Sequence, residues 1–239
     1  MGGYVDLHAH HLPALDDGAK DEETSRRMVA AVAALGFSTL NATPHQRAGK
    51  FMPAREAIDA AFAQLEGDTR ASSPELQLGL GAENFWDEVF LTRVRDGGLP
   101  CYPGGRAFLF EVDPRLLPPR MEQALFEIRI GGRLPVLAHP ERYVGLQSDL
   151  ARAEALGRSV AMVVDLGALD GAHGRAEMKL ARRLVEEGIA HAAATDIHSP
   201  EDQRSIAAGM AWIRSRLGQA TLDRLLDENP RRILAGELP

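Results

Sequence analysis

The sequence predicts an α/β barrel in which about seven strand-and-helix units follow one another along the chain. Strand-like apolar runs alternate with helix-like patterns throughout the 239 residues, as is typical of a parallel sheet covered by helices. Aliphatic residues dominate the apolar fraction and aromatic residues make up only 5% of the chain, which suits buried parallel strands. Most of the predicted strands end at a histidine or an acidic residue. A barrel gathers such ends around one rim, whereas an open sheet more often concentrates them at one switch point.

The predicted strands are short apolar runs, each followed by polar residues or by glycine and proline. Their length and spacing leave room for one helix between successive strands. In chain order we expect strands at Tyr4–His8, Ser38–Thr43, Gln77–Glu83, Ala107–Val112, Leu134–Ala138, Val160–Asp165 and His191–Thr195.

Helical patterns separate these strands. The first, Asp21–Leu35, repeats apolar residues at helical spacing and is followed by Gly36, a residue typical of helix C-termini. The second opens at Pro53, which is favoured in the first turn of a helix. No linker or shift in composition divides the chain, so we expect one domain over residues 1–239. Further helices are expected at Arg120–Ile130, Asp149–Leu156, Arg175–Glu187 and from about Asp202 to Leu234, broken near Gly218 and by Pro230.

Composition narrows the function classes. The formal net charge is -7, which argues against a general nucleic-acid binder, since such proteins usually carry a basic face. The one cysteine, Cys101, cannot form an intrachain disulfide and does not point to an oxidising compartment. No apolar run approaches the roughly 20 residues needed to span a bilayer, and no basic-then-apolar leader is found. We therefore expect a cytoplasmic protein without membrane insertion.

Two histidines lie one residue apart in Asp6-Leu7-His8-Ala9-His10, at the end of the first apolar run. On a strand, His8 and His10 point the same way and can hold one metal ion. Alone this spacing is a weak signal. Asp196-Ile197-His198 repeats it after the last strand, and other strands end near the further candidate ligands His45, Glu83, Glu111 and His139.

The candidate ligands combine imidazoles and carboxylates, a mixture that suits Mn, Fe or Zn better than Mg or Ca. They exceed the number of ligands that one ion takes, which predicts a cluster of two or three ions. Glu83 and Glu111 end apolar strands, where an acidic side chain would be costly without a positive partner. Asp16-Asp17-Gly18, by contrast, reads on its own as a turn.

Five residues resemble functional groups without fitting the pattern. Cys101 and Arg106 are spaced one residue too closely for the Cys-x5-Arg loop of thiol-dependent phosphatases, so we do not expect a nucleophilic cysteine. His11 would point away from His10 and is expected to be structural. His173 and His191 lie away from the predicted carboxyl ends of the strands, and we expect neither to bind metal.

Taken together, these motifs resemble the PHP (polymerase and histidinol phosphatase) superfamily, and within it the manganese-dependent tyrosine-protein phosphatases of bacterial capsule and exopolysaccharide clusters (CpsB/CapC-like). The Asp-Asp-Gly-x-Lys and His-Pro-Glu-Arg-Tyr segments are the specific part. The matching segments are Asp6 to His10, Leu12-Pro13, Asp16 to Lys20, Ala42 to His45, Gly81 to Glu83, Phe110-Glu111, Ala138 to Tyr143, Thr195 to His198 and Asn229-Pro230.

The resemblance implies a distorted (β/α)7 barrel of the PHP type with three divalent metal ions, Mn being expected and Fe or Zn the alternatives. It assigns ligands to each ion. The first ion would take His8, His10, Glu83 and Asp196; the second Glu83, Glu111 and His139; the third Asp17, His45 and His198.

The resemblance also places a phosphate-contacting arginine at Arg142, where a planar guanidinium fits phosphate oxygens. The family's second arginine follows the last histidine by a short loop. In this sequence Gln203 occupies that place and Arg204 follows it, so Arg204 is the candidate for the second contact.

The expected activity is hydrolysis of a phosphomonoester, with phosphotyrosine on a protein as the preferred substrate. A metal-bound hydroxide would attack the phosphoryl group while Arg142 stabilises its charge. The family implies a tyrosine kinase of polysaccharide assembly as partner, and a role in regulating capsule or exopolysaccharide synthesis.

Three other functions are alternatives to phosphotyrosine hydrolysis. A PHP phosphatase could act on a small ester such as histidinol phosphate or a nucleotide, whereas the acidic charge disfavours a nucleic-acid end. A metal-dependent amide-ring hydrolase is disfavoured because Glu111 stands at a strand end where such enzymes commonly carry a carbamylated lysine. A regulatory module without turnover has no support, because no expected ligand is missing.

Overall fold

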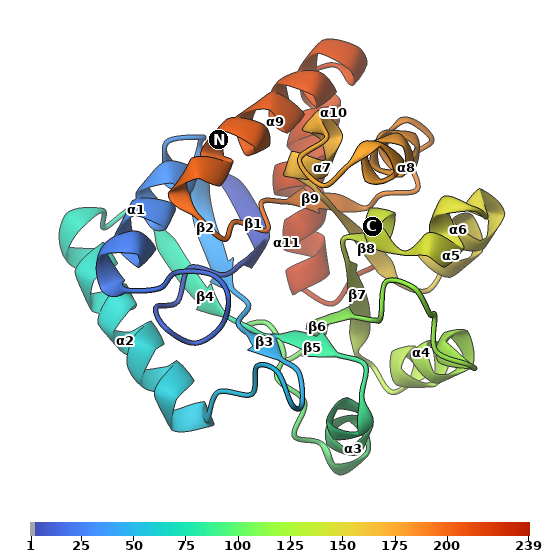
Figure 1. Cartoon of the computed structure of the whole chain (residues 1–239), viewed down its shortest axis with the longest axis horizontal. Coiled ribbons are helices and arrows are strands. Elements are labelled where there is room, and N and C mark those ends of the chain that lie inside the picture. The colour runs from blue at the N-terminus through green and yellow to red at the C-terminus, as the bar shows by residue number, and fades with distance from the viewer. Residues whose placement is uncertain (1–2) are drawn as a thin grey trace.

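Parallel strands form the centre of the protein and helices surround them (Figure 1). The computed structural model describes residues 3–239. Within that range the strands form two parallel sheets. The first sheet has the order β1 (Tyr4–Ala9), β2 (Phe37–Ala42), β4 (Gln77–Leu80). The second has the order β3 (His45–Gln46), β5 (Glu83–Phe85), β6 (Ala107–Glu111), β7 (Leu134–Ala138), β8 (Ala161–Asp165), β9 (Ala192–Ala194).

The two sheets join on both sides into a distorted barrel, as the sequence predicts. On one side the backbone N–H of His10 donates to Ile197 (3.0 Å) and that of Asp196 donates to His8 (2.9 Å), which ties β1 to the segment after β9. On the other side β2 leads into β3, and β4 into β5, with no helix between them. The strand expected at Gln77–Glu83 is therefore wrong in one respect, because it is split into β4 and β5 as it passes from one sheet to the other.

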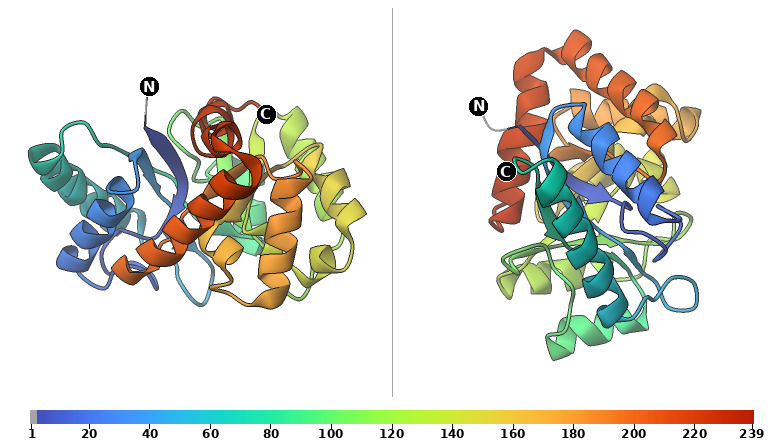
Figure 2. Two further views of the ribbon diagram at one scale, coloured as in Figure 1. Left: turned by 90° about the horizontal axis from the view of Figure 1, so that it is seen from above. Right: turned by 90° about the vertical axis from the view of Figure 1, so that its left-hand side faces the viewer.

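The helices follow the strands along the chain and cover the outside of the barrel (Figure 2). Side-chain caps fix several of their starts: Asp21, for example, accepts the N–H of Thr24 at the start of the first helix. Their bounds are α1 Glu22–Ala33, α2 Arg55–Ser72, α3 Glu88–Asp96, α4 Met121–Ile130, α5 Val144–Gln147, α6 Leu150–Gly157, α7 Leu166–Asp170, α8 Arg175–Glu186, α9 Gln203–Leu217, α10 Gln219–Asp223 and α11 Asn229–Leu234.

The structure differs from the predicted helices in two ways. The helices α3, α5 and α7 were not expected, because each is too short, at nine, four and five residues, for a clear periodic pattern. Pro230 does not break the last helical region. A π-helical turn at Arg224–Glu228 leads into α11, and Pro230 lies in the first turn of α11, where its missing N–H leaves no bond unmade.

Alternate residues of the strands face opposite sides, as the period of a strand requires. Phe108, Phe110 and Met162 belong to the core between the strands and the helices. Leu109, Val163 and small residues such as Ala107, Ala138 and Ala194 fill the narrow interior of the barrel. The start of β1 and the C-terminal residues lie on one side of the molecule (Figure 2), so the carboxyl ends of the parallel strands face the other side. Among residues 3–239, every helix is too short or too polar to cross a bilayer.

Candidate metal centre

The nine predicted ligands all lie at the carboxyl-end rim of the barrel. Parallel strands deliver their ends to one rim, so residues far apart in the chain meet there. In chain order, His8 lies in β1 and His10 just after it; Asp17 lies in the following loop; His45 and Glu83 open β3 and β5; Glu111 ends β6; His139 follows β7; and Asp196 and His198 follow β9.

Glu83 lies at the centre of this cluster, and its side chain is only 1% exposed. Its Oε2 atom lies 3.4 Å from Nε2 of His8 and of His10 and 2.9 Å from Nδ1 of His45. Its Oε1 atom lies 2.8 Å from Nε2 of His139. One buried carboxylate thus faces four imidazoles, as a bridging metal ligand would.

Asp196 closes the side of the cluster next to β1. Its Oδ1 atom lies 3.3 Å from Nε2 of His8 and 3.5 Å from Nε2 of His10. These two ring nitrogens are 3.0 Å apart and so point at the same place. The side chains of the two histidines therefore point the same way, as their one-residue spacing on a strand predicted.

A more exposed part of the cluster surrounds Asp17, whose side chain is 42% exposed. Its Oδ1 atom lies 3.2 Å from Nε2 of His45 and 3.6 Å from Nε2 of His198. His45 also faces inward, with Nδ1 3.3 Å from Oε1 of Glu111. His45 therefore stands between the outer and the inner part of the cluster.

The residues fit divalent cations. Among the described residues 3–239, four buried atoms of the cluster find no hydrogen-bond partner: Nδ1 of His45, Oε2 of Glu83, Oε1 of Glu111 and Oδ1 of Asp196. Unpaired buried polar atoms are costly, and carboxylate oxygens and imidazole nitrogens are good ligands for Mn, Fe or Zn. Ligand atoms within 4.8 Å of one another form four overlapping groups: His10, Asp17, His45 and His198; His8, Glu83 and His139; His8, His10 and Asp196; and His45, Glu83 and Glu111.

The charges of the cluster reinforce one another. Burial disfavours the charged imidazole of His45, but the Glu83 and Glu111 carboxylates outweigh it and raise the pKa of His45 to about 10. Burial alone would likewise raise the pKa of the Glu83 carboxyl, yet the surrounding imidazoles, His8 first, hold it well below its usual range. The Glu83 carboxylate is thus kept ionised, the form that binds metal.

Two candidate ligands have a backbone conformation that is unusual for residues other than glycine. His139 has φ 34° and Asp196 has φ 47°, both in the left-handed region. This conformation costs of order 1 kcal/mol or more and persists where the surrounding structure imposes it, most often at functional sites. The strain turns both side chains from the strand ends toward the cluster.

Asp16 supports the cluster from behind, a role that the sequence did not reveal. Its Oδ2 atom lies 2.9 Å from Nδ1 of His10 and accepts the backbone N–H of His45 (3.0 Å). It thereby leaves Nε2 of His10 directed at the other ligands. The turn needs Gly18, because a Cβ atom there would come within 1.9 Å of the carbonyl oxygen of His10. The Asp-Asp-Gly sequence is both a turn and part of the site.

Arg142 borders the cluster on the next part of the rim, in the short 3-10 turn Pro140–Arg142. Its Nη2 atom donates to Oδ2 of Asp196 (2.6 Å) and to Oδ2 of Asp165 (2.9 Å). Burial opposes the guanidinium charge, but the two carboxylates outweigh it and raise the pKa of Arg142 further. A side chain that is 26% exposed and permanently charged can therefore meet an anion at the mouth of the site.

The second predicted arginine has different surroundings. Arg204 is exposed and lines a surface groove between α1 and α9, together with Arg27 and Glu201. None of the nine candidate ligands lines this groove. Gln203 donates its amide to the carbonyl of Ala31 (3.0 Å) in α1. A phosphate contact by Arg204 stays a prediction.

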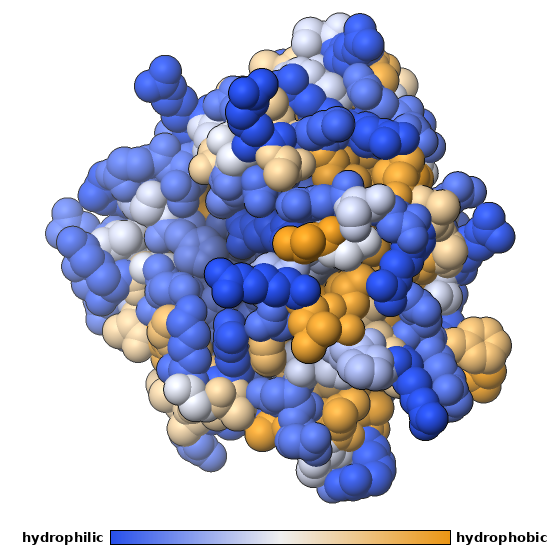
Figure 3. Space-filling model, turned by 45° about the vertical axis from the view of Figure 1, so that its right-hand side comes forward, coloured by the Kyte–Doolittle hydropathy of each residue, from blue (hydrophilic) through white to orange (hydrophobic). Residues whose placement is uncertain are grey.

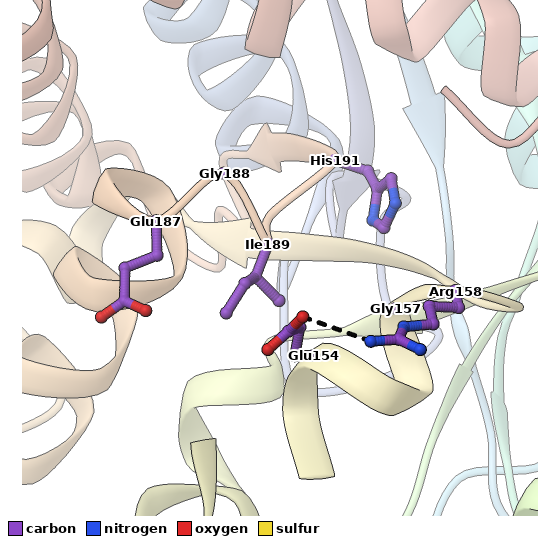
Figure 4. Close-up of a pocket in the computed structure, with 7 residues that line it drawn as sticks. All are labelled: Glu154, Gly157, Arg158, Glu187, Gly188, Ile189 and His191. Atoms are coloured by element: carbon purple, nitrogen blue, oxygen red, sulfur yellow. Dashed lines mark hydrogen bonds and ion pairs between the residues drawn. The ribbon is translucent and has the colours of Figure 1, made fainter. Parts of the chain in front are cut away.

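Two residues set aside in the sequence lie where expected. Burial raises the pKa of the Cys101 thiol, which disfavours the thiolate that a nucleophile needs. His191 precedes β9 and so lies at the opposite end of the barrel from the cluster. Figure 4 shows its pocket there, in which Arg158 pairs with Glu154 (3.4 Å).

The expectation that His173 lies away from the strand ends is wrong. Its Nε2 atom contacts Oδ2 of Asp165, the last residue of β8, and lies 3.0 Å from Nη2 of Arg142. The loop after α7 returns to the rim, which sequence spacing could not show. Asp165 was also missed, although it ends its strand as Glu111 ends β6, so the signal that found Glu111 could have found it.

A model of a known protein family matches nearly the whole chain. Residues 4–235 match the family model "Capsular polysaccharide synthesis, CpsB/CapC". The chain belongs to the CpsB/CapC family. This membership covers all nine candidate ligands and Arg142.

Relatives within the CpsB/CapC family are named as phosphatases. The chain is 26% identical to the tyrosine-protein phosphatase CpsB of Streptococcus pneumoniae, over 98% of this chain and 99% of that protein. It is 27% identical to the tyrosine-protein phosphatase YwqE of Bacillus subtilis, over 98% and 92%. A solved structure from work on YwqE and CpsB, described as unique metal-dependent tyrosine phosphatases, superposes with a TM-score of 0.87 at 26% identity, covering 98% of this chain and 95% of that one.

Proposed function

We propose that this chain is a metal-dependent phosphatase that hydrolyses phosphotyrosine on proteins. The observation that carries the proposal is the convergence of nine ligand-type side chains on one rim, beside the permanently charged Arg142. Family membership and the names of the relatives point to the same chemistry.

We propose that three divalent ions bind in the cluster, with Mn expected and Fe or Zn as alternatives. His8, His10, Glu83 and Asp196 would hold the first ion; Glu83, Glu111 and His139 the second; and Asp17, His45 and His198 the third. When bound, such ions supply a nucleophile made from water near neutral pH and offset the charge of the phosphoryl oxygens.

The protein's own side chains bind and orient the substrate in this proposal. The guanidinium of Arg142 donates hydrogen bonds to a phosphoryl oxygen, while Asp165 and Asp196 fix its position. Asp16 keeps the His10 ring in one orientation. Since these groups are already in place, they need little reorganisation when charge develops on the phosphoryl group.

Exposed apolar side chains beside Arg142 favour an aromatic ester over a small polar one. Val144, two residues after Arg142, is 51% exposed, and Leu116 is 68% exposed. The N–H of Val144 donates to the carbonyl of Pro114 (2.9 Å), which brings the two loops together. Figure 3 shows hydrophobic residues gathered among polar ones on one face of the molecule. An aromatic ring and neighbouring peptide side chains could pack on Val144 and Leu116.

The protein substrate that we propose is a tyrosine kinase of polysaccharide assembly, and the role is regulation of capsule or exopolysaccharide synthesis. The family description and the relatives named CpsB support this link. We also propose a cytoplasmic location, which accords with the single cysteine of the chain.

The test is phosphate release from a phosphotyrosine peptide by metal-stripped protein, with and without added Mn. We expect turnover only with Mn, and a loss of roughly 100-fold in kcat/KM for Arg142→Lys with unchanged metal content. Arg204→Ala, measured in parallel, shows whether the second arginine shares the task; its place in the outer groove leads us to expect less than about a threefold loss. Activity that survives complete metal removal would overturn the proposal. Turnover of small phosphate esters but not of the peptide would mean that the substrate of this phosphatase is a different one.

A further inference from the structure

Asp165, which orients Arg142 in the proposed function, also contacts His173, a residue that the proposed function does not use. Nε2 of His173 contacts Oδ2 of Asp165, and Nη2 of Arg142 donates to the same oxygen (2.9 Å). As a carboxylate, Asp165 can only accept hydrogen bonds, so Nε2 of His173 carries the hydrogen. Nε2 of His173 and Nη2 of Arg142, which lie 3.0 Å apart, are therefore two donors to the same oxygen of Asp165.

Asp165 is held rigidly. Its side chain is 2% exposed, and its Oδ1 atom accepts the N–H of Gly167 (2.7 Å) as the N-cap of α7. This bond fixes the carboxylate plane, so Oδ2 has one available direction. Oδ2 points toward the rim, where it meets His173 and Arg142.

The loop between α7 and α8 brings His173 to this carboxylate. Gly171 (φ 91°) and Gly174 (φ 127°) flank it in conformations that residues with a side chain rarely adopt. His173 is 36% exposed, whereas Asp165 lies beneath it. Among residues 3–239, Nδ1 of His173 has no hydrogen-bond partner, so this nitrogen is available at the mouth of the site.

We propose that His173 is the general acid that protonates the leaving oxygen of the substrate, and that Asp165 is its positioning residue. The inference rests on the proposed phosphatase function. An ionised carboxylate that holds one imidazole nitrogen fixes the tautomer and stabilises the imidazolium, as in other Asp–His pairs. Tyrosine is a poor leaving group, because its phenolate is strongly basic, and a proton donor accelerates its departure.

The position of His173 agrees with the direction of the reaction. The attacking and leaving oxygens lie roughly in line with phosphorus between them. A water molecule activated at the ligand cluster would attack from that side, so the leaving oxygen would depart on the outer side. Arg142 links the two sides: its Nη2 atom is 2.6 Å from Asp196 of the cluster and 3.0 Å from His173.

The water oxygen forms a bond to phosphorus and releases one proton to solvent, and the bond between phosphorus and the leaving oxygen breaks. The proton on Nδ1 of the His173 imidazolium moves to that oxygen, which leaves as neutral tyrosine. The ring then regains a proton from solvent, and the other product is inorganic phosphate.

The groups around the His173 ring include one cation and several acidic side chains. Asp165 and Arg142 contact its ring directly. Behind Asp165, the buried Glu141 accepts the N–H of Asp165 (3.2 Å), and burial raises the pKa of Glu141 well above its usual value, which favours its neutral form. From α8, Glu177 approaches the same loop, with Oε2 within 2.6 Å of where a Cβ of Gly174 would lie. Asp165 is thus the carboxylate in direct contact with the ring.

The decisive experiment compares two esters that differ in their leaving group, phenyl phosphate and p-nitrophenyl phosphate, on the metal-loaded enzyme. For His173→Ala we expect a loss of about 100-fold in kcat/KM on phenyl phosphate and only a few-fold loss on p-nitrophenyl phosphate, whose leaving group needs no proton. Equal losses on both esters would overturn the general-acid role, since a phosphate contact or a structural role affects both alike. No loss on either would also overturn it.

Arg175→Ala is the matched control, because it removes an exposed side chain two residues along the same segment. It should leave the ratio between the two esters unchanged. The comparison does not depend on a peptide substrate, so failure of the phosphotyrosine proposal would be seen separately, in the wild type.

A second measurement is independent of activity. In ¹⁵N NMR spectra of the Zn-loaded protein, the His173 ring, assigned by its loss in His173→Ala, should show the hydrogen on Nε2. Asp165→Asn should abolish this preference. A wild-type ring with its hydrogen on Nδ1 would overturn the proposed orientation.

Discussion

At the two ends of the barrel, the pKa values of buried histidines shift in opposite directions. At the carboxyl ends of the strands, burial lowers the pKa of His45, but the carboxylates of Glu83 and Glu111 outweigh burial and raise that pKa to about 10. At the amino ends, burial acts on His191 without such a partner and lowers its pKa to about 4 (Figure 4). His191 instead accepts the backbone N–H of Met162 through Nδ1 (3.1 Å), which requires a neutral ring.

The same contrast separates two neighbours in the chain. The hydrogen bond to Asp16 and the nearby carboxylates of Asp196 and Glu83 outweigh burial and raise the pKa of His10 well above its ordinary value. The next residue, His11, is fully buried, and burial, with His10 nearby, lowers its pKa to about 4. Within the part of the chain that the structure describes, neither ring nitrogen of His11 has a hydrogen-bond partner.

The contrast teaches that burial does not distinguish a ligand from a structural histidine in this fold. The difference lies in where the carboxylates are, and they are concentrated at one rim. The comparison can therefore be tested by removing a carboxylate at that rim, or by removing a neutral histidine away from the cluster.

The largest effect is expected for Glu83→Gln. In the metal-free protein, breaking a buried charge cluster should lower the free energy of unfolding at pH 7 by about 3 kcal/mol. The pKa of His45 should fall from about 10 toward its ordinary value, because Glu83 is its main carboxylate partner. Urea unfolding and an NMR titration of the histidines would measure both changes. Glu75→Gln, an exposed glutamate, is the control; an unchanged His45 titration in Glu83→Gln would contradict the account.

A smaller effect is expected for His191→Asn, which keeps an acceptor for the N–H of Met162. Since the folded pKa of about 4 lies below the unfolded value near 6.5, the unfolded chain binds more protons between these values. Wild-type stability is therefore complete above about pH 6.5 and decreases as the pH falls toward 4.

Urea unfolding at pH 7 and at pH 5 measures this difference on metal-free proteins. Between these two pH values the wild type should lose about 2 kcal/mol more than His191→Asn. Equal losses for the two proteins would show that His191 is not held neutral by the fold.

The smallest effect is expected for His11→Leu. Removing an unpartnered buried imidazole should raise the free energy of unfolding at pH 7 by about 1 kcal/mol, because no hydrogen bond is lost. Metal content should not change, since the ring lies outside the ligand groups. A destabilised variant would mean that the ring is satisfied in solution, for example by a bound water.

Much of the fold followed from local patterns. The strand at Leu134–Ala138 is confirmed to the residue, because a short apolar run between Gly132 and a polar segment has few other solutions. The split of Gln77–Glu83 into β4 and β5 could not be predicted, since both halves are apolar and the break depends on which neighbouring strand each half meets. The helix α7 was missed because five residues are too few for a periodic pattern.

The ligand candidates could be named from the sequence because strand ends are local and parallel strands share one rim. His8, Glu83 and Asp196 each follow from that rule. Asp165 obeys the same rule and was missed; in the structure it both caps α7 and reaches the rim. Roles that depend on contacts across the rim, such as that of Asp16 behind His10, are not encoded in spacing.

The sequence by itself determined the barrel, the residues at its rim and the family, because periodicity and strand-end chemistry are properties of short segments. Only the tertiary structure decided which rim residues contact one another. His173 is the clearest case: the α7–α8 loop, with glycines on either side, folds back to place it on Asp165 and beside Arg142. The path of a loop depends on the packing of everything around it, and no local pattern specifies that packing.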